Sequence, residues 1–179
     1  MNDPRTVMRF VNAAHFLDHY AMLVFAAAVL VMAPMFGLTY SELLPYATPG
    51  FIAFGAGSLL TGWLGDRWSR RHMLVIFFFG LGLALVATGV TRTPRQLGMA
   101  LLAIGTFASI YHPVGTAMLV GHADRLGREV GINGVWGNLG VACAALVTGV
   151  LRSSCPVRSR WRSESPFCAQ WHTSSGSRA

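Results

Sequence analysis

The chain has 179 residues, of which 53% are hydrophobic and only 12% are charged. Because a soluble domain carries about a quarter charged residues, this composition argues against a soluble protein and predicts a membrane protein. Lys and Arg number 14 against 7 acidic residues. These basic residues fall in short loops between apolar runs, so they do not indicate a nucleic-acid partner. Three cysteines (Cys143, Cys155 and Cys168) show neither C-x-x-C spacing nor a disulfide framework.

Five apolar runs follow one another along the chain, and each is long enough to cross a bilayer as a helix. They cover about residues 10–36, 43–64, 73–90, 97–120 and 130–151. The first run is not a cleavable signal peptide, because it is long, contains Asp18 and is followed by four more runs. The sequence therefore predicts an all-α integral membrane bundle of five transmembrane helices in residues 1–151.

The arginines divide unevenly between the two sides of such a bundle. If the N-terminus is inside, the cytoplasmic segments hold seven of them: Arg5, Arg9, Arg67, Arg70, Arg71, Arg125 and Arg128. The two external turns hold only Arg92 and Arg95. Because Lys and Arg are retained on the cytoplasmic side, this split predicts a multi-pass protein of the cell (inner) membrane with a cytoplasmic N-terminus.

Small residues and proline mark where the predicted helices pack closely or bend. In the second run Ala53, Gly57 and Thr61 recur at every fourth position, a spacing typical of close helix contact. The fourth run contains His112-Pro113, and a proline inside a membrane helix frees a carbonyl and bends the helix. The fifth run opens with glycines that indicate close contact or bending: Gly131, Gly134, Gly137 and Gly140.

Ionisable and polar side chains inside the predicted spans gather at one depth. His15, Asp18 and His19 share one face of the first span, because they lie at positions i, i+3 and i+4. Asp18, His112 and Asn138 each lie eight residues from the cytoplasmic end of their span, or about 12 Å at helical rise. We therefore expect Asp18 or His19 to lie within about 10 Å of His112, close enough for bridging by side chains or water.

Three interpretations of this polar layer remain open. It could line a transport cavity in which Asp18 or a histidine exchanges protons, since histidine titrates near neutral pH. It could bind a metal, since His15-x-x-Asp18-His19 is similar to the H-x-x-E-H zinc motif, although a third ligand and a general base would be needed for a membrane metalloenzyme. The groups could also merely satisfy one another. The cavity is favoured, because ionisable residues inside a membrane are usually functional.

Between the second and third runs lies a short basic loop, Gly62-Trp63-Leu64-Gly65-Asp66-Arg67-Trp68-Ser69-Arg70-Arg71. It resembles the signature loop between helices 2 and 3 of major facilitator superfamily transporters, with Ser69 where that family usually has glycine. The resemblance covers about residues 10–151 and implies five helices of a six-helix half of a twelve-helix transporter, with no enzymatic activity and no cofactor. It also implies a missing C-terminal half, in which a helix end faces Asp66, and a lipid-surface anchor at Arg70 and Arg71.

Three further pieces resemble the fosmidomycin-resistance type of efflux protein: His15-Phe16-Leu17, Tyr111-His112-Pro113 and Gly137-Asn138-Leu139-Gly140. In that group an acid commonly follows the histidine of the first span by four residues. Here His19 stands at that place, and Asp18 comes one residue earlier. The resemblance implies proton-coupled efflux of a small molecule.

The character of the sequence changes abruptly after Leu151. Residues 152–179 contain five arginines and many serines, with no helical or strand period. We expect this polar tail to be disordered or out of frame, because a transporter half would continue into a sixth apolar helix. We also expect that the chain does not transport on its own, and the alternative to a working transporter part is an inactive truncated product.

Overall fold

The computed structural model describes residues 3–154. Within them every regular element is a helix: α1 (Pro4–Met35), α2 (Tyr40–Leu43), the 3-10 helix η1 (Leu44–Ala47), α3 (Thr48–Arg67), α4 (Arg70–Gly89), α5 (Pro94–Ala108), α6 (Tyr111–His122) and α7 (Leu126–Ser154). A first compact unit runs to Thr148, and the last residues of α7 belong to a second unit, Gly149–Ala179. Of the tail predicted from residue 152, three residues continue α7, and residues 155–179 lie outside the described part.

Five segments of the described chain are long and apolar enough to cross a membrane: Pro4–Met35, Tyr40–Arg67, Arg70–Gly89, Pro94–His122 and Leu126–Val150. The predicted all-α bundle with five membrane-spanning helices is therefore confirmed. Large apolar side chains point outward from it, for example Leu59 (82% exposed) and Phe79 (71% exposed). Such a surface suits contact with lipid rather than with water, because lipid acyl chains, unlike water, neither offer nor need hydrogen bonds.

The first span begins at Pro4, before the predicted start near residue 10, because a polar cap precedes the apolar run. The Asp3 carboxylate accepts hydrogen bonds from the backbone N–H groups of Arg5 (3.3 Å) and Thr6 (3.0 Å) and from the Thr6 hydroxyl (2.7 Å). These bonds favour the ionised form and lower the pKa of Asp3, with the Thr6 hydroxyl as the largest cause. Pro4 follows at the first helical position, where its missing N–H costs nothing.

The second span is three helices rather than the single helix expected over 43–64. Thr39 begins α2 with a capping box, in which its side chain and that of Glu42 each accept from the other's backbone N–H. Pro45 and Pro49 then lie at the starts of η1 and α3. Because proline lacks an N–H and its ring crowds the preceding turn, each of these positions favours the start of a new helix over the continuation of the previous one.

The fourth span is also divided, and its break lies just before His112-Pro113. Helix α5 ends at Ala108 and α6 begins at Tyr111. Pro113 cannot donate to the carbonyl of Ser109 four residues earlier, and the Thr61 hydroxyl of α3 donates to that carbonyl instead, at 2.8 Å. A neighbouring helix thus satisfies the backbone group that proline leaves free, as membrane proteins require.

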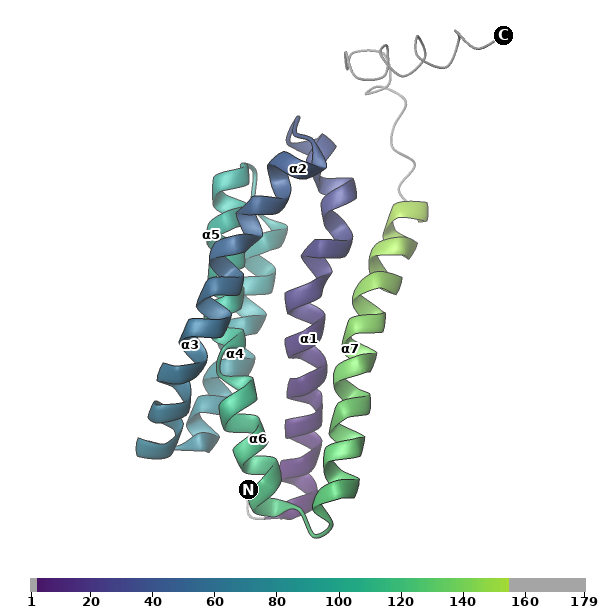
Figure 1. Ribbon diagram of the computed structural model, residues 1–179. Coiled ribbons are helices and arrows are strands. Elements are labelled where there is room, and N and C mark those ends of the chain that lie inside the picture. The colour runs from purple at the N-terminus through teal and green to yellow at the C-terminus, as the bar shows by residue number, and fades with distance from the viewer. Residues whose placement is uncertain (1–2, 155–179) are drawn as a thin grey trace, which may run out of the picture. The chain divides into compact units, whose positions relative to one another are not determined.

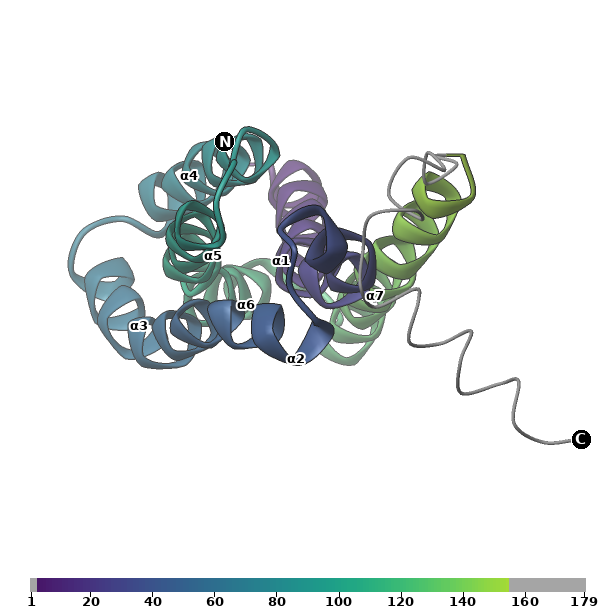
Figure 2. The same ribbon diagram turned by 90° about the horizontal axis from the view of Figure 1, so that it is seen from above.

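Glycines let several helices meet backbone to backbone. Gly105 of α5 lies directly against the carbonyl of Gly50 on α3, so that a Cβ atom at residue 105 would overlap that backbone. On the same face of α3, a Cβ atom at Gly57 would come within 2.7 Å of the Ser109 hydroxyl oxygen. The small residues of α3 therefore pack against the broken fourth span. Elsewhere in the bundle, Figures 1 and 2 both show α1 flanked by α6 and by α7.

The connections lie alternately at the two ends of the bundle. Figure 1 shows the start of α1, the α3–α4 connection and the α6–α7 connection at one end. The α1–α2 and α4–α5 connections lie at the other end. The seven arginines that the sequence assigns to one side of the membrane therefore lie in helix ends or connections at one end of the described bundle.

Candidate functional site

A polar cluster lies where the middle of α1 meets the beginning of α6. His112 Nε2 and Asp18 Oδ2 are 3.3 Å apart, and the side chain of Asp18 is 1% exposed whereas that of His112 is 43% exposed. The ring centroids of His19 and His112 are 5.8 Å apart. The prediction that Asp18 or His19 lies within about 10 Å of His112 is therefore confirmed. An acid so deeply buried requires a hydrogen-bond donor or a positive charge beside it, and His112 supplies the donor.

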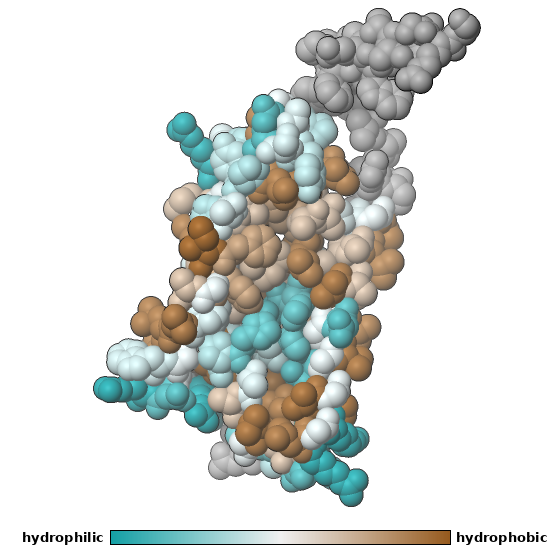
Figure 3. All heavy atoms as spheres, in the orientation of Figure 1, coloured by the Kyte–Doolittle hydropathy of each residue, from teal (hydrophilic) through white to brown (hydrophobic). Residues whose placement is uncertain are grey.

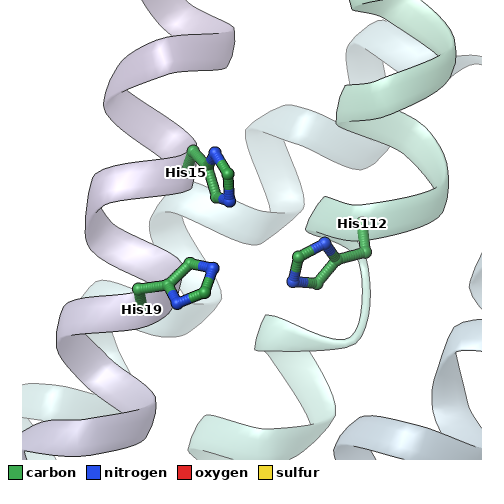
Figure 4. Close-up of side chains that lie close together, drawn as sticks. All are labelled: His15, His19 and His112. Atoms are coloured by element: carbon green, nitrogen blue, oxygen red, sulfur yellow. The ribbon is translucent and has the colours of Figure 1, made fainter. Parts of the chain in front are cut away.

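Three histidines form the accessible side of this cluster. The ring centroid of His15 lies 4.7 Å from that of His19 and 5.7 Å from that of His112. One ring nitrogen from each of the three lies within 4.8 Å of the other two. Figure 4 shows the rings facing a common space, two from α1 and one from α6. On the surface, Figure 3 shows a hydrophilic area about midway along a largely apolar face.

Asn133 of α7 connects the cluster to a third helix. Its carbonyl oxygen lies 2.8 Å from His15 Nδ1. Its side-chain oxygen accepts a hydrogen bond from the Tyr111 hydroxyl (3.1 Å), and its side-chain nitrogen donates to Asn12 Oδ1 (2.9 Å). The ring of Tyr111 also stacks on that of His15, with centroids 4.9 Å apart. One residue of α7 thus fixes side chains of both α1 and α6.

Asn138, expected in this layer, lies elsewhere. It is exposed, and its side-chain nitrogen donates to the carbonyl of Gly134 in its own helix, at 3.0 Å. The physical reason is rotation about the helix axis. Asn133, Gly137 and Gly140 lie at i, i+4 and i+7 and share the face toward α1, so Asn138 points away from that face. The asparagine that joins the cluster is Asn133, which the depth count did not single out.

Two of the predicted packing glycines bring α7 close to α1. A Cβ atom at Gly137 would come within 2.7 Å of the His15 ring, and Gly140 lies against the carbonyl of Phe16. Pro113 of α6 lies beside α3, because a Cβ atom at Gly62 would come within 3.2 Å of Pro113 Cβ. Larger residues at 137 or 140 would push away the helix that carries His15.

The histidine–acid motif of α1 does not act as a three-residue group by itself. Asp18 pairs with His112, and the compact set of imidazoles is His15, His19 and His112. In the described residues, the second carboxylate oxygen of Asp18, Oδ1, is buried and has no hydrogen-bond partner. The third imidazole of this group therefore comes from α6 rather than from the motif itself.

The basic loop folds as a tight helix–helix connection. Asp66 and Arg70 form an exposed ion pair at 2.8 Å, and the Arg67 guanidinium lies 5.2 Å from the centre of the Trp63 ring. Ser69 caps α4 by accepting from the His72 N–H, and its φ of −161° is an extended conformation that any residue adopts. Serine can therefore replace the glycine usual at this position without strain.

The remaining loop residues divide between packing and exposure. Gly65 is buried, and a Cβ atom there would come within 2.8 Å of Val114 Cγ2 on α6. Leu64 packs against the core, and Arg71 is exposed. An open surface groove connects this loop with the polar cluster along α6; its lining residues are Arg70, His112, Pro113, Thr116, Ala117, Val120 and Gly121.

Known proteins resemble this chain over most of its length. The family model described as the Major Facilitator Superfamily matches residues 11–163. A protein of Escherichia coli (strain K12) named "Putative metabolite transport protein YaaU" is 24% identical over 146 residues, which are 80% of this chain and 33% of the relative. The puromycin resistance protein pur8 of Streptomyces alboniger is 30% identical over 103 residues, which are 56% of this chain and 20% of the relative. No solved structure matches the chain significantly.

The matches span most of this chain but only a third and a fifth of these two relatives. The family match continues to residue 163, beyond the point near Leu151 where the apolar pattern stops. The matched range contains every residue of the polar cluster. With five helices able to span a bilayer and this match over more than half its residues, the chain belongs to the major facilitator superfamily.

Proposed function

We propose that this chain forms part of a secondary transporter that exports a small molecule in exchange for protons, of the fosmidomycin-resistance type. The observation that carries the proposal is the contact between buried Asp18 and half-exposed His112 in the middle of two membrane spans. Such a pair is costly inside a bilayer. In a transport cavity the Asp18–His112 pair would have a function, because the pair can take up a proton on one side of the membrane and release that proton on the other.

The roles of the residues follow from their exposure. His112 is open to the groove along α6 and can receive a proton from water, whereas Asp18 can reach that proton only through His112. His15 and His19 extend the polar wall of the cavity along α1. The half-exposed rings are the groups of this cluster that a small-molecule substrate would contact.

The proposal includes the surroundings of the chain. We place it in the cell (inner) membrane with the N-terminus and the arginine-rich connections in the cytoplasm, since those connections share one end of the bundle. A second half of the transporter would cover the open groove and face Asp66, whose exposed carboxylate can interact with a helix N-terminus. Because alternating access needs two halves that rock against each other, we propose that the chain alone does not transport.

Efflux of fosmidomycin from cells that lack their own drug exporters tests this function. The chain is expressed alone and together with the part of a full-length relative of the fosmidomycin-resistance type that begins at the relative's sixth helix. We expect efflux only from the pair, and we expect a protonophore to abolish it. Asp18→Asn should abolish efflux too, whereas Glu42→Gln, an exposed acid at the opposite end of the bundle, should leave it unchanged. Efflux that survives Asp18→Asn would remove Asp18 from the mechanism, and saturable flux by the chain alone would refute the need for a second half.

A further inference from the structure

We propose that His15, His19 and His112 form a binding site for a divalent transition-metal ion of the zinc type, with a fourth coordination position left open. The inference does not depend on the transport function proposed above, because it concerns what these three side chains can bind when the protein is at rest. Three imidazoles with one open position are a common ligand set for zinc, and imidazole also suits copper and nickel.

The distances between the rings are those of an almost closed site. One nitrogen of each histidine lies within 4.8 Å of the other two. A tetrahedral zinc ion with zinc–nitrogen bonds of about 2.0–2.1 Å needs its ligand nitrogens about 3.3 Å apart. The rings must therefore approach by about 1.5 Å, which side-chain rotation can supply. Among the described residues His19 has no hydrogen-bond partner, so no hydrogen bond holds its ring away from the other two.

Two hydrogen bonds already orient the other rings as metal ligands. The carbonyl of Asn133 can only accept, so His15 Nδ1, at 2.8 Å from it, carries the proton and leaves the lone pair on Nε2. When His112 Nε2 donates to Asp18 Oδ2 at 3.3 Å, the lone pair of His112 is on Nδ1. Metal-binding histidines almost always donate their second N–H to a carbonyl or carboxylate in this way, which fixes the ring and makes it a better ligand.

The charge at the site favours a cation. Asp18 is 1% exposed, and within the described residues its Oδ1 has no partner. A buried carboxylate with one unsatisfied oxygen is stabilised by positive charge nearby. A metal ion bound to His112 would supply that charge, and Asp18 would strengthen His112 as a ligand through their hydrogen bond.

The site also has an entry path. His112 lies at one end of the open groove that follows α6 toward Arg70 at the end of the bundle. His15 and His19 are half-buried rather than enclosed. A hydrated ion can therefore reach the three rings without unfolding any helix, which a metal site requires.

The experiment uses the purified 179-residue chain in detergent, titrated with Zn²⁺ against a chelating dye. Loss of a residue that supports a metal ligand weakens metal binding by about 10- to 100-fold. We expect His15→Ala and His112→Ala, which each remove a ligand itself, to weaken Zn²⁺ binding by at least that much. Asp18→Asn should weaken binding by about 10- to 100-fold for the same reason. His72→Ala, which removes an exposed histidine outside the cluster, should change nothing. Affinity that is equal in the native chain, His15→Ala and His112→Ala would overturn the proposal.

A second measurement needs no variant and so remains valid if a substitution prevents folding. The native chain is treated with diethylpyrocarbonate, with and without saturating Zn²⁺, and the modified histidines are identified by mass spectrometry. We expect Zn²⁺ to protect His15, His19 and His112 but not His72. Equal modification of the three with and without Zn²⁺ would show that the ion binds elsewhere, for example at cysteines. Neither readout measures transport, so failure here leaves the transport proposal standing, and the reverse also holds.

Discussion

The hydrogen bond from Thr61 to the broken fourth span offers a direct test of how this bundle is held together. Thr61→Val keeps the shape of the side chain and removes the hydroxyl that donates to the Ser109 carbonyl at 2.8 Å. No backbone donor can replace it within α6, because residue 113 is proline. Ser109 is itself buried, with 1% of its surface exposed.

The expected cost follows from that isolation. A hydrogen bond between membrane helices contributes about 0.6 kcal/mol on average and up to about 1.7 kcal/mol. A buried carbonyl left without a partner costs about 1–3 kcal/mol. Because the second situation applies here, we expect Thr61→Val to lower the free energy of unfolding by about 1–2 kcal/mol, or a factor of about 5–30 in the unfolding equilibrium.

Reversible unfolding of the chain in mixed detergent, with increasing dodecyl sulfate and followed by circular dichroism, measures this free energy. Thr106→Val is the matched control, because Thr106 is exposed and its hydroxyl donates to Leu102 of its own helix. It should cost almost nothing. Thr61→Ser separates hydroxyl from methyl and should keep most of the stability. If Thr61→Val is as stable as the native chain while Thr61→Ser is not, packing of the methyl group rather than the hydrogen bond holds the break.

Two further predictions concern the α1–α7 contact and the orientation of the chain. Gly140→Ala should lower the free energy of unfolding by about 1–3 kcal/mol, since the added methyl group meets the Phe16 carbonyl. The control is Gly134→Ala, whose added methyl group meets nothing within 4 Å and should raise the free energy of unfolding by about 0.5–1 kcal/mol. Equal effects of the two substitutions in the same unfolding assay would contradict the packing of α7 described above. Alkaline phosphatase is active only outside the cytoplasm. It should be inactive when fused at Trp68 and active when fused at Thr93, because arginine-rich loops are retained on the cytoplasmic side. The opposite result would reverse the proposed orientation.

Hydropathy and helical periodicity predicted much of this structure. The five apolar runs gave the number of spans, because the bilayer thickness sets a minimum helix length. Positions i, i+3 and i+4 placed His15, Asp18 and His19 on one face of α1, and counting residues from the span ends brought Asp18 to the depth of His112. Depth and periodicity within one helix were sufficient for these contacts.

What the sequence could not supply was the rotation of one helix against another. Asn133 and Asn138 are both asparagines of α7, and only their directions relative to α1 decide which one joins the cluster. The bend predicted from Pro113 is present as a break at Ser109, but the sequence could not show that Thr61 of another helix would donate to the carbonyl that proline leaves free. The interruption of the second span, in contrast, could have been found from Pro45 and Pro49.

The glycine contacts have a mechanical consequence for the bundle. Where α3 meets α5 at Gly50 and Gly105, and where α7 meets α1 at Gly140 and Phe16, backbone touches backbone. No side chain separates the helices at these points, so neither helix of a pair can move closer to the other without overlap of the two backbones. At the polar cluster the junction of α1 with α6 is made by side chains, which can adjust by changing rotamer. The imidazoles of His15, His19 and His112 lie at that junction, so a ligand bound by all three would also tie α1 to α6.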